Sequence, residues 1–309
     1  MANSTMVMEF LLEDFANKWE LRFLHFLSFL LMYLATLIGN LLILIATTFD
    51  QNLHTPMYFF LRNLSILDVS YVSVTVPNGC INSLTKNRSI SVAGCGTQIF
   101  LVIYCAYVEL LFLTIMAHDR YVAICKPLYY PVIMNYQFCL QMTLVSLLSG
   151  LIYAGVHTGS TFRLSFCQSN VVHQFFCDIP SLLRLSCSDT FSNLLLLIIS
   201  IIVVCGGSFI CITMSYIHIL STVLKFPTRE RGKAFSTCVP HIIVVLVFLI
   251  SGSYVYLKPS TASETFQEMF FSVFYTIVPP FLNPVIYSLR NKQVKEAVKK
   301  ILLKFHLRK

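Results

Sequence analysis

The chain has 309 residues, of which 56% are hydrophobic and only 12% are charged, and its mean hydropathy is +0.74. Soluble domains carry about 25% charged residues, so this composition excludes an ordinary soluble protein and predicts a membrane protein. Much of the net charge of +8 lies in residues 290–309, which hold eight Lys or Arg and one acid. We expect this segment to face anionic lipid in the cytoplasm, and we expect no nucleic-acid partner.

Seven uncharged stretches predict seven membrane spans. A helix needs roughly 20 residues to cross the hydrocarbon layer. The second and third stretches extend through Asp68 and Glu109, whereas the long fourth and fifth include loop residues, so we place those two helices at about 138–158 and 191–224. The stretches are residues 23–49, 69–85, 89–108, 127–162, 190–224, 234–257 and 269–289.

These spans define the fold class and three parts of the chain. We predict an all-α membrane protein with a seven-transmembrane helix bundle over residues 23–289. An extracellular tail, residues 1–22, precedes the bundle, and residues 290–309 follow it in the cytoplasm. Lys and Arg gather on the side of the C-terminus, which places the N-terminus outside by the positive-inside rule. Asn3 opens an Asn-Ser-Thr sequon in that tail and is the glycosylation site we expect.

Four of the eleven cysteines fall on the predicted outer side. Cys95 opens the third helix, and Cys167, Cys177 and Cys187 follow at intervals of ten in the long loop before the fifth helix. Four cysteines in an oxidising compartment allow three sets of two disulfides, and the spacing does not choose among them. Either way, two disulfides would fix this loop over the mouth of the bundle.

Asp68 and Glu109 are acids inside predicted spans. Such residues usually face the bundle interior and indicate an ion site or a proton-linked switch. The alternative is a protonated acid that only makes structural hydrogen bonds. The two residues alone favour a functional site but leave both interpretations open.

The seventh span combines Pro279, Pro280 and Pro284 with Asn283 and Tyr287. A proline removes a backbone hydrogen bond, so we predict a kink in this helix. A kink beside polar side chains indicates a movable element, although packing alone would also explain it. After it, apolar residues at helical spacing among lysines predict an amphipathic helix on the inner leaflet.

The end of the third span, residues 116–125, reads MAHDRYVAIC. This string resembles the third-helix signature of olfactory receptors, within the rhodopsin-like G-protein-coupled receptors. Further stretches resemble the same family, in order and at compatible spacing, and the long outer loop is similar to that of the tetrapod-type (class II) receptors. These stretches are Gly39-Asn40 and residues 53–68, 215–216, 233–241 and 280–291. The chain departs from the family pattern at His118, where Tyr is usual, and at Leu249 and Ile250, where Tyr-Gly is common.

The resemblance implies an odorant receptor in the plasma membrane, which we expect in the cilia of olfactory sensory neurons. Its partners would be a small neutral odorant, a stimulatory olfactory-type heterotrimeric G protein that raises cAMP, membrane lipid and trafficking chaperones. It also implies disulfides Cys95–Cys177 and Cys167–Cys187, and an internal cation site for Na⁺ at Asp68 and Glu109. We expect no other cofactor. The activation switch that it implies consists of Asp119, Arg120, Tyr121, Tyr216, His241, Asn283, Pro284 and Tyr287, flanked at the G-protein surface by Lys225, Arg229, Arg231 and Lys233.

Projection of the family's ligand pocket onto single helical faces gives a largely apolar lining. Leu249 replaces the usual Tyr, so we expect packing of Phe248 and Leu249 to relay ligand contact. The predicted lining is Val102, Ile103, Ala106, Tyr107, Ser200, Val204, Gly252, Tyr256 and Thr276.

An enzyme is not expected, since the chain has no phosphate-binding loop, zinc-protease motif or nucleophile elbow, and we predict neither a catalytic nor a metal site. The competing class is a secondary transporter or channel, because intramembrane acids also couple ions. No repeat relates the two halves of the chain, and seven spans with a basic amphipathic tail favour the receptor.

Overall fold

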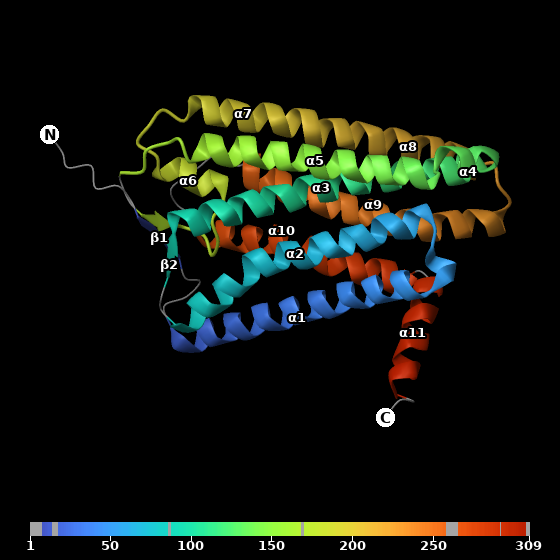
Figure 1. Cartoon of the computed structure of the whole chain (residues 1–309), viewed down its shortest axis with the longest axis horizontal. Helices are drawn as coiled ribbons and strands as arrows, with labels where there is room; N and C mark the ends of the chain where they lie inside the picture. The colour runs from blue at the N-terminus through green and yellow to red at the C-terminus, as the bar shows by residue number, and fades with distance from the viewer. Residues whose placement is uncertain are drawn as a thin grey trace.

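The computed structural model describes residues 8–13, 18–85, 88–167, 170–257, 265–290 and 292–306. Long helices lie side by side along the bundle axis, with α3 packed against α2, α5, α8 and α9 (Figure 1). Six spans are α1 (Trp19–Phe49), α2 (Pro56–Thr85), α3 (Val92–Cys125), α5 (Tyr136–Thr161), α9 (Thr228–Leu257) and α10 (Thr265–Arg290). The remaining span, fifth in chain order, consists of α7 (Phe191–Ile201), the π-helical turn η3 (Ile202–Gly206) and α8 (Gly207–Val223).

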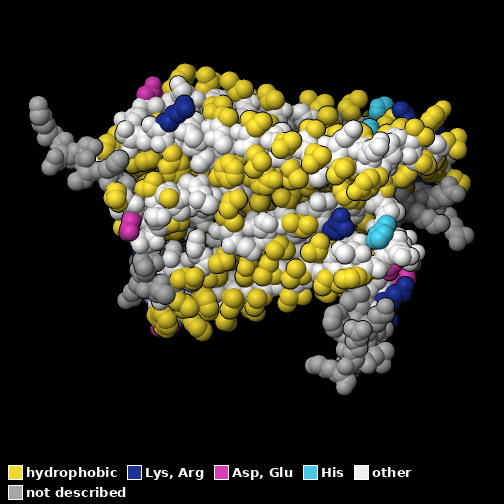
Figure 2. All heavy atoms as spheres, in the orientation of Figure 1, with side chains coloured by type: hydrophobic (Ala, Val, Ile, Leu, Met, Phe, Trp, Pro, Cys, Tyr) yellow, Lys and Arg dark blue, Asp and Glu magenta, His cyan; other side chains and the backbone are white. Residues whose placement is uncertain are grey.

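The hydropathy of these helices agrees with seven spans. Within the described residues, six are long and apolar enough to cross a membrane, and α10 contributes the shorter apolar stretch Phe274–Ile286. Hydrophobic side chains cover the length of the bundle on the face shown in Figure 2, and charged side chains lie toward its two ends. Exposed apolar side chains such as Leu31, Ile152 and Ile210 therefore face the hydrocarbon of the bilayer.

Several helices differ in their bounds or regularity from the spans predicted by the sequence. The fourth span, expected at about 138–158, begins at Tyr136 because the Asn135 side chain accepts from Phe138 N at 2.8 Å and caps the helix. The fifth is not one regular α-helix, since η3 inserts a wider turn beside Gly206 and Gly207. The first begins at Trp19, so residues 1–22 are not simply a tail.

One end of the bundle, which we call the sheet end, carries a three-stranded sheet that the sequence did not predict. Its strand order is β2 (Ser89–Ser91), β1 (Glu9–Leu12), β3 (Val171–Val172), with β1 antiparallel to β2 and parallel to β3. Strand β1 alternates exposed and buried side chains, so Phe10 and Leu12 point into the protein. The N-terminal segment thus packs against α3 and the loop before the fifth span.

Two disulfides also lie at the sheet end. Cys95 is joined to Cys177 and Cys167 to Cys187, with Cα–Cα distances of 5.5 and 6.0 Å. These are the pairings that the family resemblance implies. The Cys95–Cys177 bridge holds the start of α6 (Ile179–Leu185) beside α3, where Ile179 and Leu182 join the buried cluster around Phe10.

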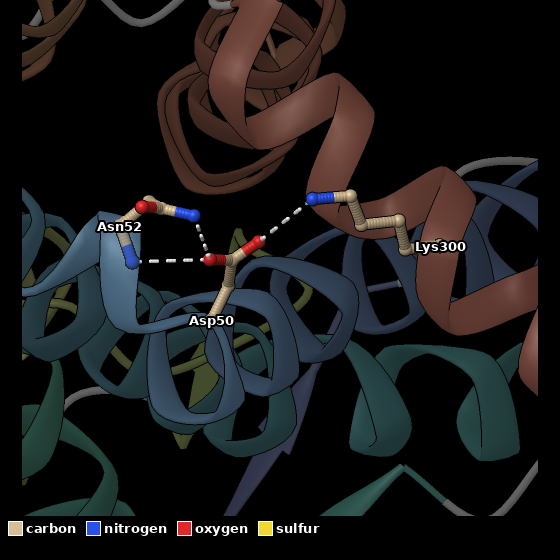
Figure 3. A network of polar contacts seen from close by, with 3 residues as sticks. All are labelled: Asp50, Asn52 and Lys300. Atoms are coloured by element: carbon tan, nitrogen blue, oxygen red, sulfur yellow. Dashed lines mark hydrogen bonds and ion pairs between the residues drawn. The ribbon is translucent and has the colours of Figure 1, made fainter.

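The opposite end, which we call the α11 end, holds the short helices η1 (Gln51–Leu53), η2 (Pro127–Tyr129) and α4 (Tyr130–Ile133) and the amphipathic helix α11 (Lys292–His306). Helix α11 starts at this end and extends away from the bundle, crosswise to the long helices (Figure 1). Its Val294 and Ala297 are buried in the main core. The Lys300 ammonium lies 3.9 Å from Asp50 Oδ2, while Asp50 Oδ1 accepts from Asn52 N at 3.0 Å (Figure 3). The predicted amphipathic helix is therefore docked on the loop after α1.

Candidate functional site

A cavity of about 120 Å³ lies among the helices toward the sheet end. Ile179 of α6 borders it, and side chains from α2, α3, α5, the fifth span, α9 and α10 complete its wall. The wall is mostly apolar, and no Lys, Arg, Asp or Glu is among the described residues that line it. They are Tyr71, Val102, Ile103, Ala106, Tyr107, Leu110, Tyr153, His157, Ile179, Leu197, Ile201, Val204, Cys205, Phe248, Leu249, Ser251, Gly252, Ser253 and Tyr275.

Six of the nine predicted pocket residues line this cavity: Val102, Ile103, Ala106, Tyr107, Val204 and Gly252. Two others do not. Ser200 lies behind the wall, where its hydroxyl donates to Leu197 O at 2.9 Å, and Thr276 is fully buried beside the lining residue Tyr275. The side chain of Tyr256 lies outside the described residues. Phe248 and Leu249, expected to relay ligand contact, both line the cavity.

Helix α5 contributes a wall that the sequence reasoning missed. Tyr153 stacks on Tyr107 with ring centroids 4.5 Å apart, and His157 follows Tyr153 one turn later, also at 4.5 Å. The signal in the sequence was the Tyr153/His157 pair, two aromatic rings with polar atoms at i and i+4 on one face of the helix. The predicted lining contains residues of the third, fifth, sixth and seventh spans but none of the fourth.

A polar cluster occupies the centre of the bundle. Asp68, Glu109 and Asn283 come from α2, α3 and α10 and are all almost fully buried. The Asn283 amide nitrogen lies 3.0 Å from Asp68 Oδ2 and 3.2 Å from Glu109 Oε1, so one amide donates to both carboxyl groups. Asn283 Oδ1 is buried and has no hydrogen-bond partner among the described residues. The structure therefore brings the two predicted acids together, with an unused acceptor beside them.

The Gly39-Asn40 pair on α1 fits against the prolines of α10. Pro284 has no N–H, so the carbonyl of Pro280, four residues earlier, loses its helical partner. Asn40 Nδ2 donates to that carbonyl at 3.1 Å and replaces the missing bond. A Cβ at Gly39 would lie 2.9 Å from both Cβ and Cγ of Pro284, so only glycine permits this approach.

Asp119 and Arg120, adjacent members of the predicted switch, do not form an ion pair with each other. Adjacent residues on a helix point in different directions, which separates the two side chains. Asp119 Oδ1 instead accepts from the Tyr130 hydroxyl of α4 at 2.8 Å. Burial, and then the charge of Asp119, raises the pKa of the Tyr130 phenol above its usual range, so Tyr130 remains a neutral donor. Arg120 is 5% exposed, and its Nε and Nη1 find no partner among the described residues.

The other predicted switch residues lie near Arg120 or in α10. Tyr216 of α8 and His241 of α9 approach at 2.7 Å between the phenol oxygen and Nδ1, which joins the fifth and sixth spans. The Tyr121 ring lies between those of His218 and the exposed His118, with centroid distances of 5.7 and 5.9 Å and tilted ring planes. The Tyr287 side chain lies outside the described residues, as do those of Arg229 and Lys233 and the whole of Asn3.

Comparison with known proteins identifies the family. Residues 29–305 match the family model described as olfactory receptor. The chain is 64% identical to human olfactory receptor 14C36 over 98% of this chain and 97% of that one. It is 50% identical to human olfactory receptor 14A16 over 96% of each chain.

A solved structure gives the same fold. Squid rhodopsin superposes with a TM-score of 0.76 at 16% identity, covering 93% of this chain and 87% of the other. At that identity the likeness concerns the seven-helix fold alone. The curated relatives are receptors rather than enzymes. With a family model spanning most of the bundle and relatives aligned over nearly their whole length, the chain belongs to the olfactory receptor family.

Proposed function

We propose that this receptor binds a small neutral odorant in the cavity between α3, α5 and α9 and activates a stimulatory olfactory-type G protein, which raises cAMP. The cavity carries the proposal. It is enclosed by apolar and aromatic side chains, it has a few polar groups, and it contains no charged residue among those described. Phe248 and Leu249 place α9 in direct contact with anything bound there.

The α11 end supplies the surface for the G protein. Arg120 is a buried cation whose Nε and Nη1 have no hydrogen-bond partner among the described residues, and buried donors without a partner are costly. A conformational change that moves α9 away from α3 would uncover it and allow it to bind an acceptor on the G protein. Lys225 and Arg231 lie on the same end and would flank that surface, together with Arg229 and Lys233.

The test is a cAMP reporter assay in cells that co-express a stimulatory olfactory-type G protein and trafficking helpers. A library of volatile compounds is screened against the wild type, Arg120→Ala and the charge-matched control Arg163→Ala, which removes an exposed arginine at the sheet end. We expect responses that Arg120→Ala abolishes and Arg163→Ala keeps. Ligand uptake without cAMP would instead indicate a transporter, and silence with verified surface expression would contradict the proposed coupling.

We further propose that Na⁺ binds between Asp68 and Glu109. Carboxylates and amide carbonyls are hard oxygen ligands, and a flip of the Asn283 amide would direct the unpartnered Oδ1 at the ion. A bound Na⁺ would offset one negative charge at two carboxyl groups that otherwise share one amide donor. We expect Na⁺, compared with N-methylglucamine, to raise the unfolding temperature of the wild type but not of Glu109→Gln. Equal shifts in both would argue against this site.

We also propose that the sheet end faces the cell exterior, with the receptor in the ciliary plasma membrane, Asn3 glycosylated and export assisted by chaperones. An epitope at the N-terminus should bind antibody on intact cells, and Asn3→Gln should remove a glycosidase-sensitive mass. Antibody binding only after permeabilisation would indicate the opposite orientation.

A further inference from the structure

His157 is a buried polar side chain on the wall of the cavity. It lies on α5, is 4% exposed, and lines the cavity beside Tyr153 and Tyr107. Most of the remaining wall is aromatic or aliphatic. A phenylalanine would fill similar space without the need to satisfy two ring nitrogens, so packing does not account for the histidine.

The ring of His157 has no hydrogen-bond partner among the described residues, although the backbone carbonyl of the same residue accepts from Thr161 at 2.9 Å. Other polar groups nearby are engaged. The Tyr153 hydroxyl donates to Ser200 Oγ at 3.2 Å, and the Ser251 hydroxyl donates to Phe248 O at 3.2 Å. Tyr107 and Ser253 also line the cavity but are only half-buried.

The His157 side chain as a whole is almost fully buried, but neither of its ring nitrogens is among the buried side-chain atoms that lack a partner, so the nitrogens keep some access to the cavity. A neutral imidazole carries one donor and one acceptor nitrogen, and leaving either buried without a partner is unfavourable. A hydrocarbon that filled the cavity would leave the ring in that state. A ligand of the same shape with a polar atom would instead form a hydrogen bond to the ring, so we expect it to bind more tightly.

We infer that His157 determines the class of ligand: a neutral molecule about the size of one six-membered ring that carries a hydrogen-bonding oxygen. The inference rests on the proposed function of the cavity. A cavity of about 150 Å³ holds benzene, and this one has about 120 Å³. A carboxylate is disfavoured because no Lys or Arg is present among the described residues of the lining.

The experiment compares matched probes on the purified full-length receptor, so that no G protein is needed. Dissociation constants are measured by ligand-observed NMR for phenol against toluene and for cyclohexanone against methylenecyclohexane. The two members of a pair partition differently into detergent, so the compared quantity is the ratio of their dissociation constants in each variant. The variants are His157→Leu, His157→Gln, which keeps hydrogen-bonding groups, and the control Val156→Ala on the exposed face of the same helix.

We expect His157→Leu to lower the preference for the oxygenated probe about fivefold relative to the wild type, the value of one neutral hydrogen bond. His157→Gln and Val156→Ala should stay within about twofold of the wild type. We also expect His157→Leu without ligand to unfold at or above the wild-type temperature, because it removes an unsatisfied group, whereas a structural histidine would give a clear loss.

The inference is overturned if the wild-type ratio persists in His157→Leu or if neither member of any pair binds the wild type. Failure of His157→Leu and His157→Gln to fold would also overturn it, since that outcome assigns His157 to the core. A preserved binding ratio without cAMP signalling would contradict only the proposed coupling. Signalling by a ligand that is insensitive to His157 would contradict only this inference.

Discussion

The two ends of the bundle are held together by different interactions. At the sheet end, two disulfides, a three-stranded sheet and an apolar cluster around Phe10 join the N-terminal segment, α3 and α6. From the centre to the α11 end, the contacts between spans include hydrogen bonds of buried polar side chains, among them Asn283 with Asp68, Tyr216 with His241, and Tyr130 with Asp119.

The difference has a mechanical consequence. Covalent bridges and close apolar packing resist rearrangement, since any displacement loses contacts outright. A hydrogen bond between side chains can be exchanged for another partner at small net cost. The sheet end is therefore suited to hold the cavity in one shape, and the α11 end is suited to change between arrangements. This contrast makes the following substitutions informative.

The largest effect is expected for Phe10→Ala at the sheet end. Phe10 is fully buried and meets Phe166 edge to face at 5.4 Å between ring centroids. Removing such a side chain costs about 3 kcal/mol, but detachment of β1 limits the loss to that region. We expect the amides of Leu11 and Leu12, which donate to Asn170 O and Arg88 O, to exchange hydrogen about a hundredfold faster.

Leu11→Ala is the matched control for Phe10→Ala. Leu11 lies on the same strand, points to the opposite face and is 37% exposed. Its truncation should change exchange only slightly. If both variants behaved alike, the sheet end would not depend on its apolar cluster, and the contrast between the two ends would fail there.

The sheet end also shows which structural features could not be predicted from the sequence. The seven spans and the amphipathic α11 follow from the distribution of charge and from hydrophobic periodicity, both of which are visible within one segment of the sequence. Strand β1 has four residues and pairs with segments about 80 and 160 positions away, so no local pattern indicates it. Its three consecutive apolar residues, 10–12, also lack the polar-apolar alternation that indicates a half-buried strand.

The candidate site divides in the same way. The cavity residues on α3 could be predicted because the spacing of residues defines one face of a helix. The α5 wall was missed because which face of one helix meets another depends on close packing, here at Gly150, where a Cβ would lie 2.7 Å from Val108 Cγ2. The bond between Tyr130 and Asp119 likewise joins two different elements, so the motif at 119–120 does not reveal it.

A second substitution tests the close contact between α1 and α10. In Gly39→Ala the new Cβ meets the rigid ring of Pro284, so we expect a loss of about 1–3 kcal/mol and a lower unfolding temperature in detergent. The displaced helix would also weaken the bond from Asn40 to Pro280 O. On α5, Gly155→Ala adds a Cβ with nothing within 4 Å and should be neutral or slightly stabilising. Equal unfolding temperatures for the two variants would contradict the close approach at Gly39.

The smallest effect is expected for Tyr130→Phe, which removes one hydroxyl at the α11 end. Asp119 is 2% exposed, so loss of its hydrogen bond should lower stability by about 1.5 kcal/mol. If an activated arrangement lacks this bond, the same free energy shifts the equilibrium toward it by about tenfold, and basal cAMP should rise. Tyr129→Phe is the control, because Tyr129 is 64% exposed. A stability loss without a change in basal signalling would mean that the Tyr130–Asp119 bond persists in both arrangements. The movable part of the α11 end would then lie elsewhere, and the Tyr216–His241 contact would be the next to test.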